Sequence, residues 1–239
     1  MLTAAPCWHG RWFRLIGRTT AWIIFCVAGH LAASSAQAGF IFVSSTPGPT
    51  GGPASGPFVN SFQKWGVRFA VSSTVTTATI GGHFDRFDGF GAPVGTTIFG
   101  ALVALSSNTD LPDSNDLSTP DVLGSTELTI PSVSNDSQII DAPLSVTLAP
   151  GWYAVVFGSQ SLIHGGTAAN GIAMTTNTDI GNPSYISLSP DTGGIWGNTS
   201  TDGFHFFVTA VPEPSGLLMA ALAAIGLTLL RPRYKSRQG

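Results

Sequence analysis

The sequence predicts an all-β fold: a single antiparallel β-sandwich or jelly-roll-like domain, with an N-terminal signal helix and a C-terminal single transmembrane helix. Three observations predict it. Short apolar or alternating runs are separated by clusters of Gly, Pro, Asn and Asp. Only 10% of the residues are charged, and no long window has the helical period, so exposed helices built on Glu and Lys are missing. Each end of the chain carries an uncharged apolar run next to basic residues.

Residues 1–38 have the pattern of a secretory signal peptide. The apolar region spans 21–33, and the small residues Ala36 and Ala38 predict cleavage after Ala38. Three arginines supply the basic region: Arg11, Arg14 and Arg18. Because there is no adjacent arginine pair, the general secretion machinery and signal peptidase are the expected partners.

Cysteine usage and charge narrow the function of the exported part. Both cysteines, Cys7 and Cys26, lie in the signal segment, so the mature protein has no disulfide, thiol nucleophile or thiolate metal site. Between Gly39 and Val211, three basic residues stand against twelve acidic ones, a net charge of −9. This charge repels phosphate backbones, so nucleic acid is excluded as a partner.

One β-sandwich domain is expected over 58–210, after a Pro/Gly-rich lead-in over 39–57. The lead-in contains a first strand at Phe40–Val43 and is otherwise expected to be mobile or extended. Further strands are expected at 64–71, 74–82, 97–105, 123–130, 144–148, 152–157, 185–188 and 204–211.

These strands differ in their expected burial. Apolar and polar residues alternate along 64–71, which predicts one buried face. The runs 97–105 and 152–157 are apolar on both faces, which predicts central strands. Residues 74–82 are rich in Thr, Val and Ile, as strands prefer. The polar segment 108–120 is expected to be an acidic loop with nothing to bury.

The carboxyl-terminal segment predicts a membrane anchor. Fourteen uncharged residues run from Leu217 to Leu230, and as a helix they would span about 21 Å of a hydrocarbon core of about 30 Å. Insertion is expected to be marginal, helped by snorkelling of the basic side chains that follow. The anchoring side chains would be Leu217, Leu218, Leu222, Ile225, Leu227, Leu229 and Leu230. A basic cluster then predicts a cytoplasmic carboxyl end: Arg231, Arg233, Lys235 and Arg237.

A four-residue motif stands two residues before this run: Val211, Pro212, Glu213 and Pro214. Over 211–237 the motif, the apolar run and the basic end resemble the PEP-CTERM sorting signal of Gram-negative bacteria that make extracellular polysaccharide, although Pro232 and Tyr234 interrupt the usual arginine cluster. The resemblance implies that an exosortase-type membrane protease or transpeptidase cuts near the motif and passes the protein to the envelope or matrix. A plain anchor that is never processed is the alternative.

The body of the chain resembles the exported domains with interchangeable C-terminal anchors that often precede this signal. The similar stretches are Phe69–Ile80 and Leu148–Val156. The resemblance implies two paired strands in the first stretch and a strand entered from a turn in the second. It adds support for a β-sandwich and implies no activity.

Four carboxylates in or beside the acidic loop form a candidate calcium site: Asp110, Asp113, Asp116 and Asp121. Calcium takes oxygen ligands, but their three-residue spacing departs from that of an EF-hand loop. A solvated polar loop is the favoured interpretation. No cofactor is therefore predicted, with calcium as the alternative, and no other metal site is assigned.

Aromatic residues offer a candidate surface for stacking on sugar rings, for which Tyr185 and Trp196 are the candidates. Trp196 lies between glycines in an expected loop, so its ring is expected to be exposed. Trp65 and Trp152 lie in expected strands, where large aromatic residues belong mostly to the core.

No catalytic residue is assigned. Gly158–Leu162 lacks the Gly-x-Ser-x-Gly elbow of serine hydrolases, and the turn after His164 resembles an oxyanion turn only faintly. The body has one glutamate, Glu127, which disfavours a glycosidase with paired carboxylates. No two of its histidines have the spacing of metal ligands.

The sequence thus predicts an exported, non-enzymatic protein of the cell envelope or extracellular matrix. It would be anchored in the inner membrane with its body in the periplasm, and then reach the cell surface or matrix after processing. Exopolysaccharide is a further expected partner. A carbohydrate- or calcium-binding adhesion module is the first alternative, and an unrecognised secreted hydrolase is the second.

Overall fold

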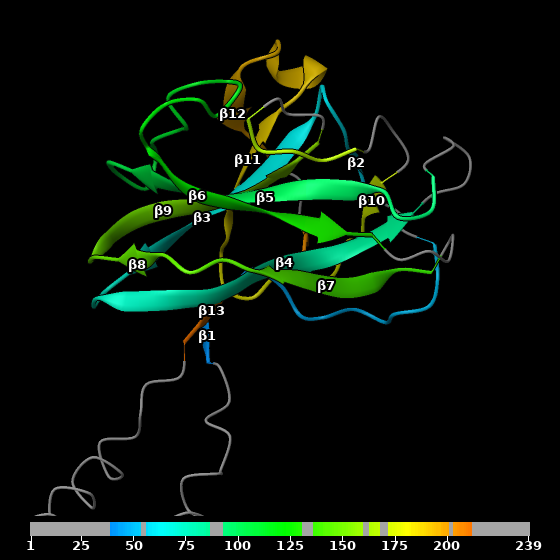
Figure 1. Cartoon of the computed structure of the whole chain (residues 1–239), viewed down its shortest axis with the longest axis horizontal. Coiled ribbons are helices and arrows are strands. Elements are labelled where there is room, and N and C mark those ends of the chain that lie inside the picture. The colour runs from blue at the N-terminus through cyan, green and yellow to red at the C-terminus, as the bar shows by residue number, and fades with distance from the viewer. Residues whose placement is uncertain are drawn as a thin grey trace, which may run out of the picture. The chain divides into compact units, whose positions relative to one another are not determined.

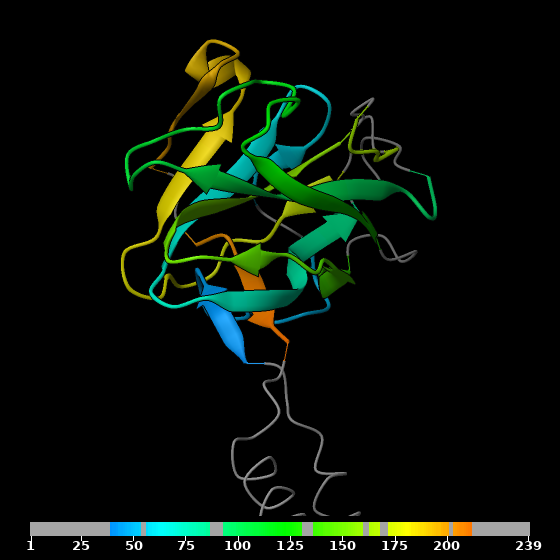
Figure 2. The same cartoon turned by 60° about the vertical axis from the view of Figure 1, so that its left-hand side comes forward.

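The computed structural model describes residues 39–53, 56–86, 93–130, 136–159, 163–167, 172–200 and 203–211. All of them lie in one compact unit, Ala38–Val211, built from two antiparallel β-sheets that lie face to face (Figures 1 and 2). The predicted all-β fold is therefore confirmed. Among these residues the only helix is the short 3-10 turn η2 (Pro190–Thr192), and none is long and apolar enough to cross a membrane. The predicted signal and transmembrane helices fall in 1–38 and 212–239, outside the described residues.

The first sheet has seven strands and is organised by one long strand. Its strands are β1 (Phe40–Val43), β13 (Phe206–Ala210), β4 (Val75–Arg86), β10 (Ile172–Met174) and β2 (Phe58–Val59) in spatial order, with β7 (Gln138–Pro143) and β8 (Thr147–Leu148) also paired to β4. The strand β4 thus pairs with β13 and β10, and with β7 and β8. A break in β4 would separate most of the sheet.

The second sheet has six strands. In spatial order they are β12 (Trp196–Asn198), β11 (Ser184–Leu188), β3 (Lys64–Val71), β9 (Gly151–Gly158), β5 (Thr97–Leu105) and β6 (Val122–Thr129). The two strands with apolar residues on both faces, β5 and β9, pair with each other near the middle of the sheet. This is the central position that their sequences predict.

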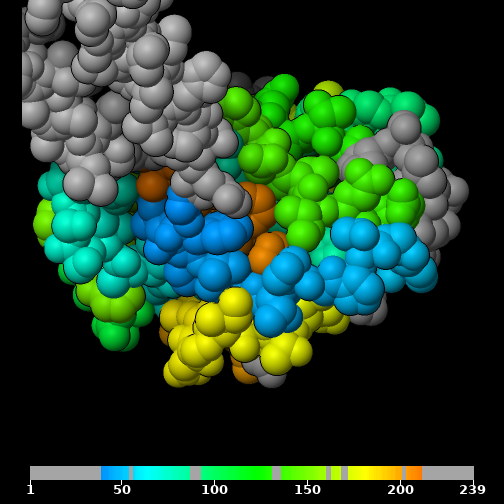
Figure 3. Space-filling model, turned by 90° about the horizontal axis from the view of Figure 1, so that it is seen from below, coloured from blue at the N-terminus to red at the C-terminus, as the bar shows by residue number. Residues whose placement is uncertain are grey.

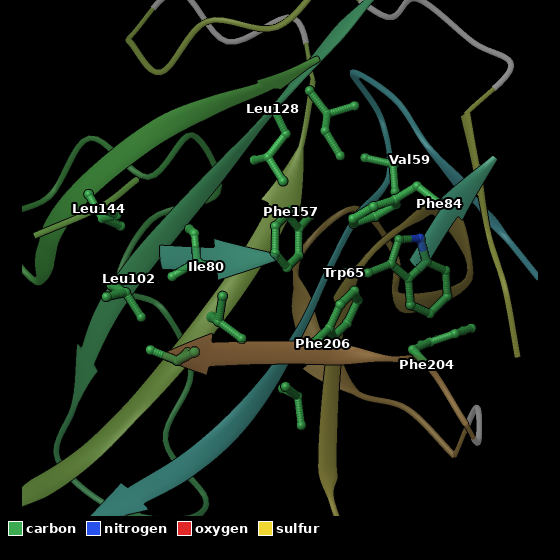
Figure 4. Close-up of a cluster of buried hydrophobic side chains, with 14 of the residues drawn as sticks. Val59, Trp65, Ile80, Phe84, Leu102, Leu128, Leu144, Phe157, Phe204 and Phe206 are labelled. Carbon is green, nitrogen blue, oxygen red and sulfur yellow. The ribbon is translucent and has the colours of Figure 1, made fainter. Parts of the chain in front are cut away.

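The main core lies between the two sheets (Figure 4). Phe84 points inward from β4, and Phe157 from β9 meets it with ring centroids 5.2 Å apart. The ring centroid of Phe206 from β13 lies 5.0 Å from that of Phe157. All three side chains are fully buried, and each such ring contributes about 2–3 kcal/mol of hydrophobic stabilisation. These contacts hold the sheets together.

A second apolar cluster covers the outer face of the six-stranded sheet. Phe99 and Val103 point outward from β5, and they are covered by Leu117 of the acidic loop and by Trp196 of β12. Leu117 is buried, so the prediction that this loop has nothing to bury is wrong. Its backbone lies in the left-handed region, with φ at 59°. A loop that reads as polar therefore carries an apolar anchor in its middle.

The strand predictions are confirmed at 40–43, 64–71 and 97–105 with the same bounds, and within a few residues at 74–82, 123–130, 152–157, 185–188 and 204–211. Of 144–148 only β8 is strand, while β2, β7, β10 and β12 have no counterpart in the sequence predictions. The prediction that 64–71 has only one buried face is wrong, because Lys64 and Arg68 on the other face are buried as well. These four unpredicted strands are short or carry polar residues, so their periodicity is weak.

The described part of the Pro/Gly-rich lead-in is joined to the seven-stranded sheet by its first strand and by backbone hydrogen bonds. β1 pairs with β13, and the residues that follow it, 44–53, form a strap across the outer face of the seven-stranded sheet. The Thr46 N–H donates to the Thr178 carbonyl at 2.8 Å, and the Gly51 N–H donates to the Ser137 carbonyl at 3.1 Å. Backbone hydrogen bonds hold the strap, which composition alone does not reveal.

Replacing Leu117 with Ala is expected to destabilise the domain by about 2–4 kcal/mol, because it empties a buried site that closes the second cluster. Leu123→Ala on β6 is the matched control, since this leucine is exposed and should cost less than about 1 kcal/mol. Urea unfolding followed by tryptophan fluorescence measures both. Equal losses would contradict an anchoring role for Leu117.

Candidate functional site

A pair of histidines is buried on the outer face of the seven-stranded sheet. Phe206 pairs with Gly82, so His205 and His83 stand opposite each other, and the His83 N–H donates to the His205 carbonyl at 3.0 Å. Phe84 faces the core, so its neighbour His83 points outward. The two histidines are nevertheless only 1% and 4% exposed. Their separation in the sequence hides this pairing.

The strap covers the histidine pair. The Nδ1 atom of His205 lies 2.7 Å from the carbonyl oxygen of Ser45, which can only accept, so Nδ1 carries a proton and donates it. The hydroxyl oxygen of Ser44 accepts the Phe206 N–H at 2.8 Å. One imidazole and one hydroxyl thus join the start of the strap to β13.

Two further polar groups complete this histidine cluster. The Asn177 side-chain amide lies 3.4 Å from Nδ1 of His83, which places the His83 proton on Nε2. That Nε2 atom is buried without a well-formed hydrogen bond among the described residues. The carboxylate of Asp85, also buried, accepts the N–H of Asp136 at 3.0 Å.

Burial keeps both imidazoles neutral. It lowers the pKa of His83, as does the nearby His205, while the Ser137 backbone and the Asp85 carboxylate act in the opposite direction. Burial also lowers the pKa of His205, while the hydrogen bond to the Ser45 backbone partly offsets this by raising it. Among the described residues, no group of three or more His, Cys, Asp or Glu side chains is arranged to hold a metal ion. The arrangement can therefore tie the strap to the sheet and respond to protons.

The third histidine of the body, His164, joins three segments. Its Nε2 lies 2.7 Å from the Leu117 carbonyl, so Nε2 is protonated and Nδ1 can accept the Ser125 hydroxyl at 3.0 Å. The N–H of Gly166, in the turn that resembles an oxyanion turn, donates to Oε1 of Glu127 at 2.7 Å. That donor is therefore already engaged, and the turn holds β6 rather than presenting a free oxyanion site.

Three of the four aspartates of the candidate calcium site, Asp110, Asp116 and Asp121, accept hydrogen bonds from the loop itself through their carboxylates. Asp110 accepts the Ser106 N–H and hydroxyl, both at 2.7 Å, and these bonds lower its pKa. Asp116 accepts the Ser118 hydroxyl at 2.7 Å, and its pKa is lowered by that bond. Asp121 accepts the Asp113 N–H at 3.1 Å. The four do not gather into one ligand set, and calcium binding stays a prediction.

Arg68 fixes the acidic loop from beneath. Its Nε donates to the Asp110 carbonyl at 2.6 Å, and one terminal nitrogen donates to the Ser184 hydroxyl at 2.8 Å. Burial lowers the pKa of Arg68, partly offset by Asp110. Lys64 is buried beside it on β3, and its pKa is lowered by burial against the attraction of Asp116. The only basic residues of β3 are thus used inside the fold.

The expectation that the Trp196 ring is exposed is wrong, and the other stacking candidate, Tyr185, is not exposed either. Trp196 is only 5% exposed, and Tyr185 is buried as well. The indole N–H of Trp196 donates to the Ser114 carbonyl at 2.9 Å, because β12 folds the ring against the acidic loop. The Tyr185 hydroxyl donates to Asp179 at 2.6 Å, and burial followed by this carboxylate raises its pKa. Neither ring offers a face for a sugar.

A turn at Gly203 connects the histidine pair to Asp179, the partner of the Tyr185 hydroxyl. His205 follows this glycine by two residues. Gly203 has a φ of 85°, and its N–H donates to the Asp179 carboxylate at 2.9 Å. A β-carbon at this position would lie 1.9 Å from the carbonyl oxygen of Asn177. Only glycine therefore allows this approach.

The sorting residues lie almost entirely outside the described residues. Val211 is the last one described, and its N–H donates to the Thr76 carbonyl at 2.8 Å. The remaining predicted residues are not described: Ala36, Ala38, Pro212, Glu213, Pro214, the anchor residues of 217–230 and the basic cluster of 231–237. Their roles stay predictions.

Acid is expected to destabilise the domain through His83 and His205. Both pKa values are lowered in the folded state from the ordinary value of 6.5, so the unfolded chain binds more protons below that pH. Stability is therefore fully present above pH 6.5 and falls as the pH decreases below it, by up to about 1.4 kcal/mol per pH unit for each imidazole. Urea unfolding between pH 7.5 and about 5, above the range of ordinary carboxylates, measures the slope.

The double variant His83→Gln, His205→Gln is expected to lose most of this dependence between those pH values. Its circular dichroism spectrum at neutral pH serves as the control for folding. A slope equal to that of the unaltered protein would show that other groups take up the protons.

Arg68→Ala is expected to loosen the acidic loop and to cost about 2–4 kcal/mol, because the part-buried carbonyl groups of Thr109 and Asp110 lose a charged donor and a buried side chain is removed. Arg68→Lys keeps the charge but loses the planar fork, so an intermediate loss is expected. Urea unfolding measures stability, and limited proteolysis detects cleavage within 106–121. If the alanine variant resists proteolysis like the unaltered protein, Arg68 does not hold the loop.

No protein-family model matches the chain, and no curated protein matches it at a significant level. The features that bear on function are therefore the acidic two-sheet domain, its buried histidines and the two terminal segments.

Proposed function

We propose that this protein is an exported, non-enzymatic component of the cell envelope or extracellular matrix, sorted through its carboxyl-terminal Pro-Glu-Pro signal. General secretion and signal peptidase deliver the domain to the periplasm. The apolar run 217–230 holds it in the inner membrane with the basic end in the cytoplasm. An exosortase-type enzyme then cuts near Pro212–Pro214 and releases or transfers the domain.

One observation carries this proposal: the bounds of the compact unit, Ala38–Val211, match the part of the chain that lies between the predicted signal segment and the predicted carboxyl-terminal anchor. The first strand starts at Phe40, two residues after the predicted cleavage site at Ala38. At the other end, Val211 is hydrogen-bonded to Thr76, and Pro212 follows it directly. Removal of both segments would therefore leave the sheet pairing intact.

The chemistry of the domain supports a structural role. His205 ties the strap to the sheet, and His164 ties the acidic loop to β6. The buried cations Arg68 and Lys64 lie under the acidic loop. Polar groups that a catalyst would present to a substrate here serve the packing of loops. The carbohydrate-binding alternative loses its two candidate rings, since both are buried.

The proposal is tested by mass spectrometry of the protein's termini, from isolated envelopes and from the medium of the native host. The mature chain is expected to begin at Gly39 and to end near Pro212–Pro214. Replacing Pro212, Glu213 and Pro214 by alanine should leave an uncut, membrane-bound form. The matched control, Pro232→Ala, changes a tail proline outside the motif and should be processed normally. Full-length protein recovered from the cytoplasm would refute export.

A further inference from the structure

The two ends of the domain lie side by side. β1 and β13 are antiparallel neighbours, and the Ala210 N–H donates to the Gly39 carbonyl at 2.8 Å. The chain therefore enters and leaves the domain at one place, the terminal corner, formed by Gly39, Phe40, Ala210 and Val211. Figure 3 shows this face, with β1 beside the end of β13.

The terminal corner is apolar and uncharged. Phe40 is 63% exposed, although its ring and that of Phe207 form a T-shaped pair with centroids 5.7 Å apart. Val211 is exposed as well. Neither β1 nor β13 contains Asp, Glu, Lys or Arg, and the strap contains none either. An exposed aromatic ring in such surroundings is suited to the interface of a lipid bilayer.

The length of the tail decides what lies against this corner. Five residues separate Val211 from Leu217, where the uncharged run starts, and they reach at most about 20 Å when extended. A folded domain of about 170 residues is about 40 Å across. With Leu217 at the membrane, the tether is shorter than the domain is wide. The terminal corner must then stay near the bilayer, and the opposite end cannot replace it.

Charge favours the same orientation. The acidic loop covers the outer face of the six-stranded sheet, through Leu117, whereas the corner belongs to the seven-stranded sheet. In Figures 1 and 2, η2 and β12 lie at the opposite end of the domain from β1. An acidic surface is repelled by anionic lipids, so it turns away from the bilayer. Exposed Asp141 on β7 limits the apolar contact to the corner itself.

We propose that the terminal corner is a lipid-contacting surface, with the Phe40 ring in the bilayer interface while the carboxyl-terminal anchor is intact. This inference rests on the anchor of the proposed function and adds the orientation of the domain. Processing near Pro212–Pro214 would remove the tether, and a single aromatic contact would then hold the domain only weakly.

The test uses the anchored chain expected after signal cleavage, Gly39 to Gly239, because an uncut signal segment would itself draw position 40 to the membrane. This chain keeps the whole compact unit from Gly39 onward and contains no cysteine. A polarity-sensitive fluorophore is attached at Phe40→Cys in one variant and at Ile195→Cys in the other. Ile195 is the matched control, since it is 60% exposed and adjoins β12. Both proteins are reconstituted into vesicles of phosphatidylethanolamine and phosphatidylglycerol that carry a nitroxide near the lipid headgroup. Urea transitions equal to that of the parent chain confirm that both variants fold.

The fluorophore at position 40 is expected to be quenched several-fold more strongly than that at 195. Equal quenching in vesicles that float with the protein would overturn the lipid contact and leave the anchor standing. Protein that fails to float with the vesicles would refute the anchor, and the corner contact with it. A Phe40→Asp variant with a third label, at Val211→Cys, should lose most of its quenching; unchanged quenching there also counts against the contact.

Discussion

The structure depends on one constraint: its six-stranded sheet is apolar on both faces. The main core buries one face through Phe157, but Phe99 and Val103 point the other way and need a cover. The acidic loop supplies that cover with Leu117, and β12 adds Trp196. Once the loop lies over the sheet, Arg68 and Lys64 are trapped beneath it, so their charges must be satisfied by loop groups. A segment rich in aspartate is thereby fixed by an apolar requirement.

The outer face of the seven-stranded sheet is covered through polar contacts instead of apolar ones. Its outer face carries His83, His205 and Asp85, and the strap that covers them is held by backbone and hydroxyl bonds. The apolar contacts of Leu117 and Trp196 contain no titrating group, although the same loop holds its turns with aspartate carboxylates. A cover that rests on neutral imidazoles weakens when protons are plentiful. The covers of the two faces of the sandwich thus respond to acid through different groups.

Sequence periodicity is sufficient where a strand is long and strongly apolar, as at 97–105 and 152–157, whose bounds and central position it predicts. It fails where backbone hydrogen bonds, rather than apolar contacts, hold a segment in place. The strap reads as a linker, because proline and glycine hide its hydrogen bonds to neighbouring segments. Trp196 reads as exposed between two glycines, because the ring's partner, Ser114, lies far away in the sequence. His83 and His205 likewise become neighbours only when β4 and β13 pair, so no local sequence spacing predicts their contact.

The bond between Gly39 and Ala210 also sets an order of events. β1 is the first strand along the described part of the chain, and β13, its sheet partner there, is the last. The earliest strand therefore stays unpaired until β13 is available, and contacts this distant along the chain form slowly. If the chain is exported as proposed, closure of the sandwich would follow the passage of β13, and a chain arrested midway would expose an open sheet edge to chaperones and proteases.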